Sequence, residues 1–337
     1  MIRYLIRRIL WACVLFIAVT IVTYLIFFII PADPAKLAAG KSARPEDVAR
    51  ARHFLGLDKP VYWQYGKFVG RLIGVHWKSH GGDIWRIKFE APSLGESFAN
   101  RQSVNSIVAR AAPVTATLVF GGVILWLLIS LPVGILSALR PRSVLDRASM
   151  TFVLIGISAH PVWIGLIFSY FIGYKWRLTP ITGYCDFFPP ANECGGPVQW
   201  AYHMILPWMT YSILFAALYA RMIRANVLEA LNEDYVRTAR AKGAPEWIVL
   251  RSHVLRNALL PVVTMLGMDI GLGLAGAVFT ERVYSLPGLG LTTVTSLNNL
   301  DLPTVEGIVV FATVAIIVFN LAVDLIYAVI DPRIRLA

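Results

Sequence analysis

Long runs of apolar residues dominate the chain and are separated by polar connections. A helix rises ~1.5 Å per residue, so about 20 apolar residues cross a hydrocarbon core of roughly 30 Å. The pattern predicts an all-α polytopic membrane protein with six transmembrane helices, at 9–30, 113–139, 148–174, 204–220, 259–280 and 304–330. The fourth is the weakest, because it is short and contains Pro207.

Composition supports a membrane protein. The 337 residues are 57% hydrophobic and 15% charged, with a mean hydropathy of +0.64, whereas a soluble domain is roughly 25% charged. The net charge of +11 would suit nucleic acid only if the basic residues gathered on a soluble surface. They lie between the apolar runs instead, as a membrane topology signal does.

Lys and Arg are distributed unevenly between alternate connections. With the N-terminus inside, the inside connections hold 15 of them and the short outside connections hold three. We therefore expect a multi-pass protein of a prokaryotic plasma (inner) membrane with both termini cytoplasmic. The first run exceeds the usual length of a secretory signal core, and no small-residue cleavage site follows it. We expect it to remain as an anchor.

The chain is expected to have three parts. Residues 1–30 form the N-terminus and first helix, 31–102 an extracytoplasmic cap, and 103–337 a five-helix core with a cytoplasmic loop at 224–258. The cap segment mixes Gly, Pro, charge and aromatic residues, and 45–56 fits a short amphipathic helix. It is either a docking surface for a delivery protein or a structural lid.

Cys185 and Cys194 fall together in a predicted outside loop, where a disulfide is permitted. Two unpaired thiols are the alternative. No metal site is predicted, because these cysteines lack a nearby histidine in the sequence. His76 and His80 are spaced to share a helix face, but the glycines after them are typical of a loop.

Catalytic motifs are missing from the sequence. Gly40-Lys41-Ser42 resembles the end of a phosphate-binding loop, but position 35 is Ala where that motif requires Gly. There is no HExxH pair and no GxSxG elbow. We therefore expect a chain that is not an enzyme by itself and carries no cofactor or metal.

The stretch 224–261 combines helix-forming residues with charge, breaks at Gly243-Ala244-Pro245 and then restarts. A glycine before a proline-led helix is a stop-and-start signal. The pattern predicts two short amphipathic helices joined by an elbow. We expect a partner's groove to receive their apolar residues, which are Tyr235, Val236, Ala239, Trp247, Ile248 and Leu250.

Residues 233–243, EDYVRTARAKG, followed by RNALLP at 256–261, closely resemble the EAA loop of binding-protein-dependent ABC importer permeases. The branch is that of dipeptide, oligopeptide and nickel importers. YSLPGLG at 284–290 and DPRIR at 331–335 also match it, so the resemblance covers essentially the whole chain.

Two positions depart from the general EAA pattern. Arg237 stands where that pattern has Glu, and Pro261 lies farther from Gly243 than in sugar permeases. Both departures are typical of permeases of the peptide branch.

The resemblance implies the type I ABC importer permease fold and a pore-forming subunit of an ATP-driven importer of di- or oligopeptides, with nickel and other small solutes open. It implies four kinds of partner: a second homologous permease, ABC ATPase subunits that bind ATP and Mg, an extracytoplasmic substrate-binding protein and membrane lipid. In this family the loop sits in a cleft of the ATPase. The expected coupling residues are Glu233, Asp234, Tyr235, Arg237, Thr238, Ala239, Arg240, Lys242, Gly243, Ala244 and Pro245.

Ionisable residues at membrane depth are costly and are therefore candidates for function. Asp269 either faces the substrate path, where it meets a cation such as a peptide amino terminus, or holds an interhelical hydrogen bond. Asp324 is expected to pair with a base. His160 precedes Pro161 and predicts a kink, with a polar ring turned toward the path as the alternative. Glu281, at the outer mouth, is the third path candidate.

Two other classes of function compete. An ion-coupled secondary transporter acting without an ATPase would have charges on broken helices of two repeats, and no repeat is evident. An intramembrane enzyme would require a nucleophile with its base, or a metal set, at membrane depth. Neither is visible in the sequence.

Overall fold

The computed structural model describes residues 2–29, 34–39, 44–55, 57–79, 85–188 and 194–330. The contacts group the chain into two compact units, Met1–Pro113 with Gly288–Ile317 and Val114–Pro287 with Val318–Ala337. Two long helices, α5 (Val104–Leu139) and α15 (Leu302–Ile330), contribute one part to each unit. The predicted division into three parts stays a prediction.

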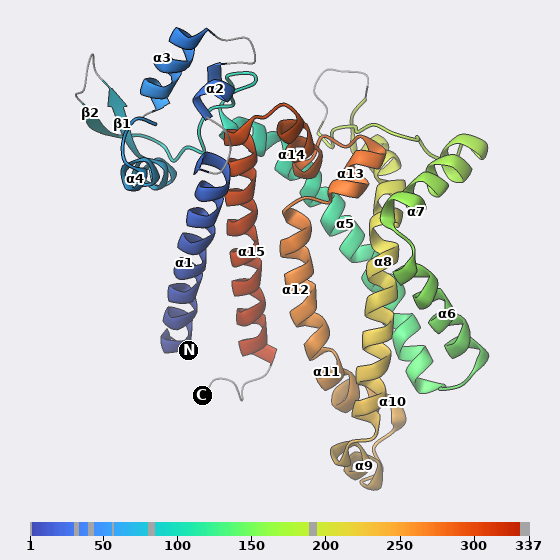
Figure 1. The fold of residues 1–337 in the computed structure, drawn as a ribbon. Helices are drawn as coiled ribbons and strands as arrows, with labels where there is room; N and C mark the ends of the chain where they lie inside the picture. Colours follow the sequence, from blue (N-terminus) through green and yellow to red (C-terminus); the bar gives the residue numbers. More distant parts are fainter. Residues whose placement is uncertain are drawn as a thin grey trace. The chain divides into compact units, whose positions relative to one another are not determined.

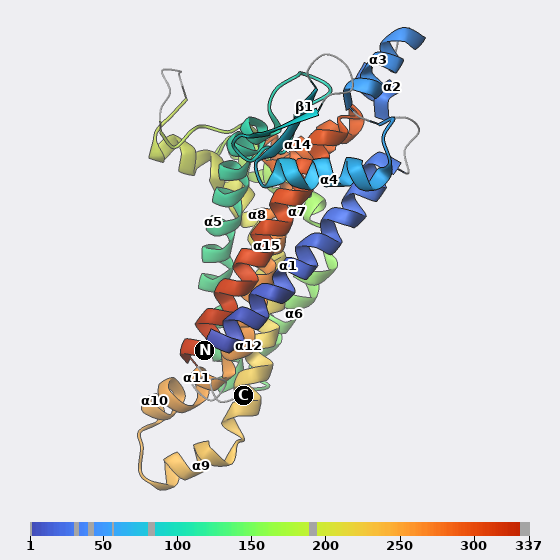
Figure 2. The ribbon, with the colours of Figure 1, turned by 90° about the vertical axis from the view of Figure 1, so that its left-hand side faces the viewer.

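The first unit combines the N-terminal helix with short helices and one β-hairpin. Its elements, besides the ends of α5 and α15, are α1 (Ile2–Tyr24), the π-helix η1 (Leu25–Ile29), α2 (Pro34–Ala39), α3 (Pro45–Leu55), α4 (Val61–Leu72), β1 (Val75–Ser79), β2 (Trp85–Phe89) and α14 (Leu289–Asn298). The strands pair antiparallel, with Val75 opposite Phe89. Figures 1 and 2 show α1 alongside the first half of α15.

Aromatic packing attaches α4 to the spans of this unit. Tyr24 of α1, Phe68 of α4 and Val310 of α15 form one buried cluster. The Tyr24 hydroxyl also donates to Gln64 Oε1 at 2.9 Å. An amphipathic helix placed in this way buries its apolar face against the spans. The segment predicted as a cap is therefore built onto the first and last membrane helices.

Asp301 fixes the beginning of α15. Its buried carboxylate accepts hydrogen bonds from the Ser97 hydroxyl (2.6 Å), the Phe98 backbone N–H (2.8 Å) and the Thr304 hydroxyl (2.6 Å). A carboxylate at a helix start satisfies N–H or hydroxyl donors there and is favoured by the helix dipole. Asp301 thus attaches the end of the cap segment to the last span.

The second unit holds the remaining helices. They are α6 (Val144–Ser158), α7 (Pro161–Phe168), η2 (Ser169–Lys175), α8 (Pro197–Leu231), α9 (Asp234–Ala241), α10 (Glu246–Ile248), η3 (Val249–Val254), α11 (Leu255–Ala258), α12 (Leu260–Leu274) and α13 (Val278–Tyr284). Small residues allow close packing within this unit. A Cβ added at Gly267 of α12 would collide with Val323 Cγ2 of α15.

Four described helices are long and apolar enough to cross a membrane alone, and two bent helix pairs raise the number to six if each pair is one span. The predicted six-helix membrane fold agrees with this count. The boundaries differ in places. The second span begins at Val104, and the fourth belongs to the 35-residue α8, which continues through Pro207.

The third and fifth predicted spans are interrupted. α6 and α7 meet at an angle of 104°, at the predicted kink, where the His160 ring Nδ1 accepts the Val162 N–H at 3.3 Å. The predicted fifth span, 259–280, ends early, because α12 stops at Leu274 and Gly276 adopts a φ of +132° before α13 begins. Glycine adopts this conformation at no steric cost.

Strand β1 corrects the interpretation of His76. We expected a loop there, but His76 lies in β1 opposite Lys88. His80 lies outside the described residues. The predicted helix at 45–56 is confirmed as α3.

Cys185 and Cys194 form a disulfide in the structure, with their Cα atoms 5.3 Å apart. His203 of α8 lies beside it, with Nδ1 3.3 Å from Cys185 Sγ. Residue spacing does not reveal this histidine, because folding and not sequence proximity brings it to the loop. The sulfur atoms of both cysteines are used by the disulfide.

We predict that peptide mapping under non-reducing conditions will recover the segments around Cys185 and Cys194 as one linked fragment, which reduction separates. Cys13, which is free and exposed on α1, serves as the internal control and stays open to alkylation. Alkylation of all three cysteines without reductant would contradict the disulfide.

Candidate coupling site

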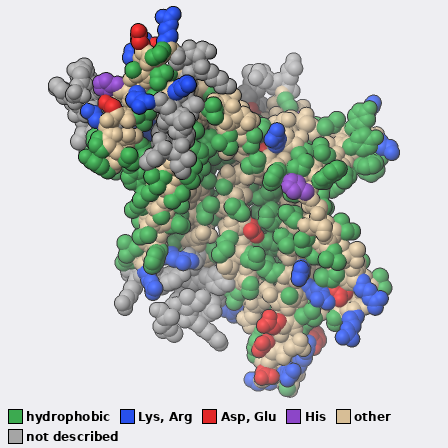
Figure 3. Space-filling model, viewed as in Figure 1, with side chains coloured by type: hydrophobic (Ala, Val, Ile, Leu, Met, Phe, Trp, Pro, Cys, Tyr) green, Lys and Arg blue, Asp and Glu red, His purple; other side chains and the backbone are tan. Residues whose placement is uncertain are grey.

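The stretch after α8 folds into a compact loop of short helices (Figure 1). α8 ends at Leu231, Glu233 stands at the N-cap position of α9, and α9 runs from Asp234 to Ala241. Figure 3 shows acidic and basic side chains gathered over this end of α8. The two predicted amphipathic helices are present as α9 and the α10–η3–α11 segment.

Gly243 forms the elbow between them. The Ala244 N–H donates to the Ala239 carbonyl at 3.2 Å, and the Gly243 N–H donates to the Arg240 carbonyl at 2.9 Å. These two bonds define a Schellman motif, which requires a left-handed residue at the glycine position. Gly243 has a φ of +79°, and no atom lies within 4 Å of a Cβ built on it. Within this chain the requirement for glycine is therefore conformational and not steric.

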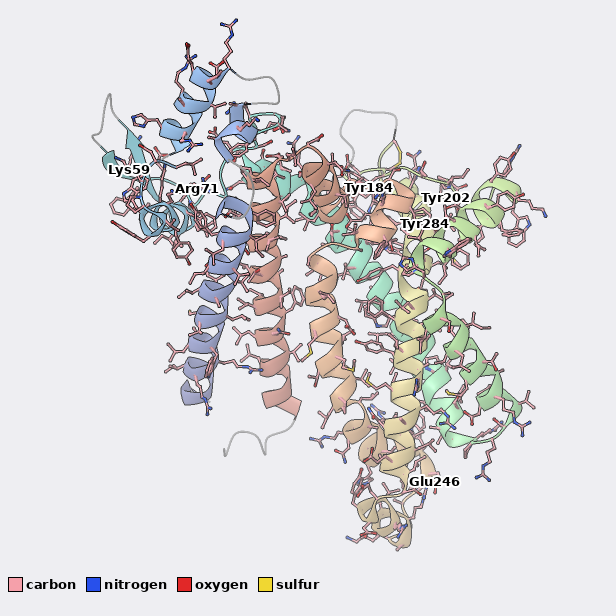
Figure 4. The ribbon with its side chains drawn as sticks, viewed as in Figure 1. Lys59, Arg71, Tyr184, Tyr202, Glu246 and Tyr284 are labelled. Carbon is pink, nitrogen blue, oxygen red and sulfur yellow. A yellow bond between two sulfur atoms is a disulfide. The ribbon has the colours of Figure 1, made fainter. Side chains whose placement is uncertain are left out.

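An ion pair spans the elbow. The Arg240 guanidinium donates to both carboxylate oxygens of Glu246, at 2.8 and 3.2 Å. Figure 4 shows Glu246 at the α10 end of the loop. Both side chains are exposed, so we assign the pair an orienting role and little net stability. It fixes the direction in which α10 leaves α9.

The apolar residues of the loop divide between two faces. Val236 is fully buried and Ala239 is 8% exposed, since α9 packs against η3. The expectation that both would dock into a partner is therefore corrected: they form the loop's own core. Tyr235 (38% exposed), Trp247 (66%) and Ile248 (48%) remain on the surface. Exposed aromatic residues of this kind are typical of interaction surfaces.

Polar contacts attach the loop to the membrane helices. The Asn226 amide of α8 donates to the Ala258 carbonyl of α11 at 3.2 Å. Farther along, Arg224 of α8 donates to both carboxylate oxygens of Asp146 on α6, at 2.6 and 2.9 Å. Asp146 is 4% exposed and also accepts the Arg142 N–H. This partly buried bidentate pair joins α6 to α8.

The three substrate-path candidates occupy different environments within the second unit. Glu281 is fully buried and accepts a hydrogen bond from Thr115 at 2.8 Å, so in this conformation it is part of the interior and not of an outer mouth. His160 is exposed, with its ring edge-on to Phe279 at 4.8 Å. Asp269 is half-buried and accepts a hydrogen bond from Tyr219 at 2.6 Å. The Asp324 side chain lies outside what the structure describes.

The YSLPGLG motif is held to the helices around it by its first residue. Tyr284 is buried, and its hydroxyl lies 2.7 Å from Thr210 Oγ1 and 3.2 Å from the Gly165 carbonyl, which accepts its hydrogen. Burial raises the pKa of Tyr284, so the phenol stays neutral. Figure 4 labels this residue on α13. The motif thus joins α13 to α7 and α8.

Two sequence families cover the chain. Residues 130–336 match "Binding-protein-dependent transport system inner membrane component", and residues 1–119 match the N-terminal region described as "Binding-prot-dependent transport system membrane comp, N-term". The chain belongs to this family. The loop from Glu233 to Pro245 lies within the first match.

Known relatives match over their full length. The dipeptide transport system permease protein of Escherichia coli (strain K12) is 34% identical over 99% of both chains. A protein of the same strain named "Probable D,D-dipeptide transport system permease protein" is 38% identical over 98% of this chain and 97% of its own. The solved MetNI methionine ABC transporter, described as inward facing, is 18% identical with a TM-score of 0.51, covering 67% of this chain and 97% of that chain.

Membership makes this chain a membrane component of a binding-protein-dependent transport system and not an enzyme on its own. The structural likeness supports the expected type I importer permease fold. The alternative of a secondary transporter acting without an ATPase is not favoured, since the family is defined by its dependence on a binding protein.

The Asp146–Arg224 pair generates a quantitative prediction. Asp146→Asn and Arg224→Met should each destabilise the protein by about 3 kcal/mol, because each leaves a mostly buried partner without its counter-charge. The double variant should lose less than the sum, with an interaction energy of about 1–3 kcal/mol.

The measurement is a double-mutant cycle on the free energy of unfolding in detergent. Arg237→Met is the matched control, because Arg237 is exposed and reaches Asp234 only at 3.5 Å. If the changes in unfolding free energy of the two single variants simply add in the double variant, the Asp146–Arg224 pair does not stabilise the packing of α6 on α8.

Proposed function

We propose that this chain is a pore-forming subunit of an ATP-driven importer of di- and oligopeptides. The observation that carries the proposal is the compact loop on α8, whose elbow at Gly243 has the residues and the geometry of a coupling element. Full-length relatives named as dipeptide permeases support the peptide cargo.

In this proposal the exposed face of the loop enters a cleft of an ABC ATPase subunit. Tyr235, Trp247 and Ile248 supply the apolar contact, and Arg237 and Lys242 supply charge at its rim. ATP and Mg are bound by the ATPase subunits. Because α8 is one helix from Pro197 to Leu231 and is braced to α6, a displacement of the loop is transmitted along it as a rigid body.

The remaining partners are a second homologous permease and an extracytoplasmic substrate-binding protein. The excess of Lys and Arg in alternate connections supports a cytoplasmic position for both termini and the loop. The loop then faces the ATPases, and the disulfide loop at Cys185 faces the oxidising side, where disulfides persist. The two topological arguments agree.

The first test is purification of the tagged chain from its native membrane in mild detergent, with mass spectrometry of what accompanies it. Stoichiometric recovery of an ATPase and a second permease, followed by ATP-dependent dipeptide uptake in proteoliposomes, is the expected result. A lone polypeptide in several detergents would overturn the proposal in favour of an ion-coupled carrier.

A substitution series at Gly243 tests the elbow. Gly243→Asn should keep uptake near the wild-type rate, since asparagine tolerates the left-handed conformation. Gly243→Val should lower uptake roughly tenfold, because that conformation costs ~1–2 kcal/mol for other residues and more for a β-branched one. No neighbouring atom within this chain would obstruct either side chain.

Uptake and ATP hydrolysis are measured together on the assembled complex, with assembly checked by size-exclusion chromatography. Equal loss of uptake in the asparagine and valine variants of assembled complexes would refute a conformational elbow and would point to steric exclusion by the ATPase.

A further inference from the structure

Asp269 is a carboxylate at membrane depth without a counter-charge among the described residues. Its Oδ2 accepts the Tyr219 hydroxyl at 2.6 Å, and no described Lys, Arg or His forms an ion pair with it. Its Oδ1 accepts no hydrogen bond from a described residue and is not sealed from the surface. An ionised group in such a place is costly unless a ligand or a water-filled space meets it.

The residue that holds Asp269 is itself rigid. Tyr219 is 1% exposed, and its ring lies 5.6 Å from the ring of Trp126, which in turn stacks on Phe215 at 4.5 Å. An aromatic side chain fixed by packing positions a hydrogen bond with little loss of entropy on binding. The cluster therefore orients the carboxylate without neutralising it.

A soft apolar stripe runs beside this carboxylate on α12. Met265 is 45% exposed, Met268 is 56% and Leu272 is 65%, and residues three or four apart share one helix face. Asp269 stands at the edge of this stripe, four residues from Met265 and three from Leu272. The opposite side of the helix is closed, since Gly267 packs on Val323.

This pairing of groups suits one class of ligand. Methionine side chains are flexible and polarisable and adapt to apolar groups of many shapes. A single carboxylate beside them recognises one invariant cation. Peptides present this combination, because their side chains vary while the α-ammonium group is common to all of them.

We infer that Asp269, oriented by Tyr219 and flanked by Met265 and Met268, contacts the α-ammonium group of peptides in transit. The inference rests on the proposed peptide cargo. Asp269 is the binding residue and Tyr219 is a positioning residue. The competing interpretation is a purely structural Tyr219–Asp269 bond between α8 and α12.

The test uses the complete importer in proteoliposomes, with the binding protein and a radiolabelled dipeptide outside and ATP inside. Asp269→Asn keeps an acceptor for Tyr219 but removes the charge. The expected result is a roughly tenfold fall in maximal uptake rate, with an unchanged dependence on the concentration of loaded binding protein, which reports docking. Asp269→Glu should restore most of the rate.

Two hydroxyl deletions provide a matched pair. Tyr219→Phe should give an intermediate rate. Tyr211→Phe should match wild type, because the Tyr211 hydroxyl lies beside Gly273 and donates no described hydrogen bond to Asp269. Wild-type uptake by the Asp269→Asn variant would overturn the inference. So would equal losses in the two tyrosine variants, which would indicate a packing defect of the aromatic cluster.

Direct contact is tested by a dipeptide probe that carries a benzophenone side chain. Illumination during turnover should attach it to Met265 or Met268, and the Asp269→Asn variant should lose this product. Uptake of the probe with crosslinks confined to other helices would contradict the site. If the wild-type complex imports no peptide at all, the proposed function itself is refuted, independently of the role of Asp269.

Discussion

Inside a bilayer no water is available to peptide groups, so each N–H and C=O must find its partner within the protein. This constraint explains why the described membrane spans are helical and how their breaks are accommodated. At the 104° bend the His160 ring accepts the Val162 N–H, and at the start of α15 the Asp301 carboxylate accepts hydrogen bonds from Ser97 and Phe98, at the end of the predicted cap segment. At Gly276 the backbone turns through a conformation open to glycine. Each interruption is thus accompanied by a local solution for the groups it releases.

The same constraint explains why the loop on α8 is connected directly to a continuous helix. A transmembrane helix that continues without a break from Pro197 to Leu231 carries the loop directly, with no flexible linker between them. The Asn226 bond to Ala258 ties the returning segment to the same helix, and the Asp146–Arg224 pair ties that helix to α6. The loop is therefore connected to two membrane helices through partly buried polar contacts. The Schellman turn at Gly243 sets the direction of that face.

The existence of the spans and the elbow could be predicted from the sequence, because apolar runs and a glycine before a proline are local signals. The ends of the helices could not, because helices such as α8 extend past the apolar stretch into polar residues whose partners, Asp146 for Arg224 and Ala258 for Asn226, are brought to them by folding. Periodicity also misplaced Val236 and Ala239: an amphipathic stripe shows that one face is buried but not whether the chain or a partner covers it. His203 was missed because its neighbour Cys185 is joined to it by folding and not by spacing. The strands β1 and β2 did carry a signal, because WRIKF at 85–89 alternates apolar and basic residues, but the glycines between the strands led us to predict a loop.

The buried carboxylates of the described residues differ in what faces them, and this difference separates structure from function. Asp146 has a bidentate arginine, Glu281 has the Thr115 hydroxyl, and Glu306 lies in the field of Arg71, whose pKa burial lowers and Glu306 raises. All three are at most 4% exposed. Asp146 and Glu281 accept hydrogen bonds from within the chain, whereas Glu306 accepts none from a described residue but is enclosed within electrostatic reach of Arg71. Asp269 has only a phenol, yet it is the one that is half-buried beside an exposed face. A carboxylate held in place but left open at its second oxygen is arranged to meet a cation that is not part of this chain.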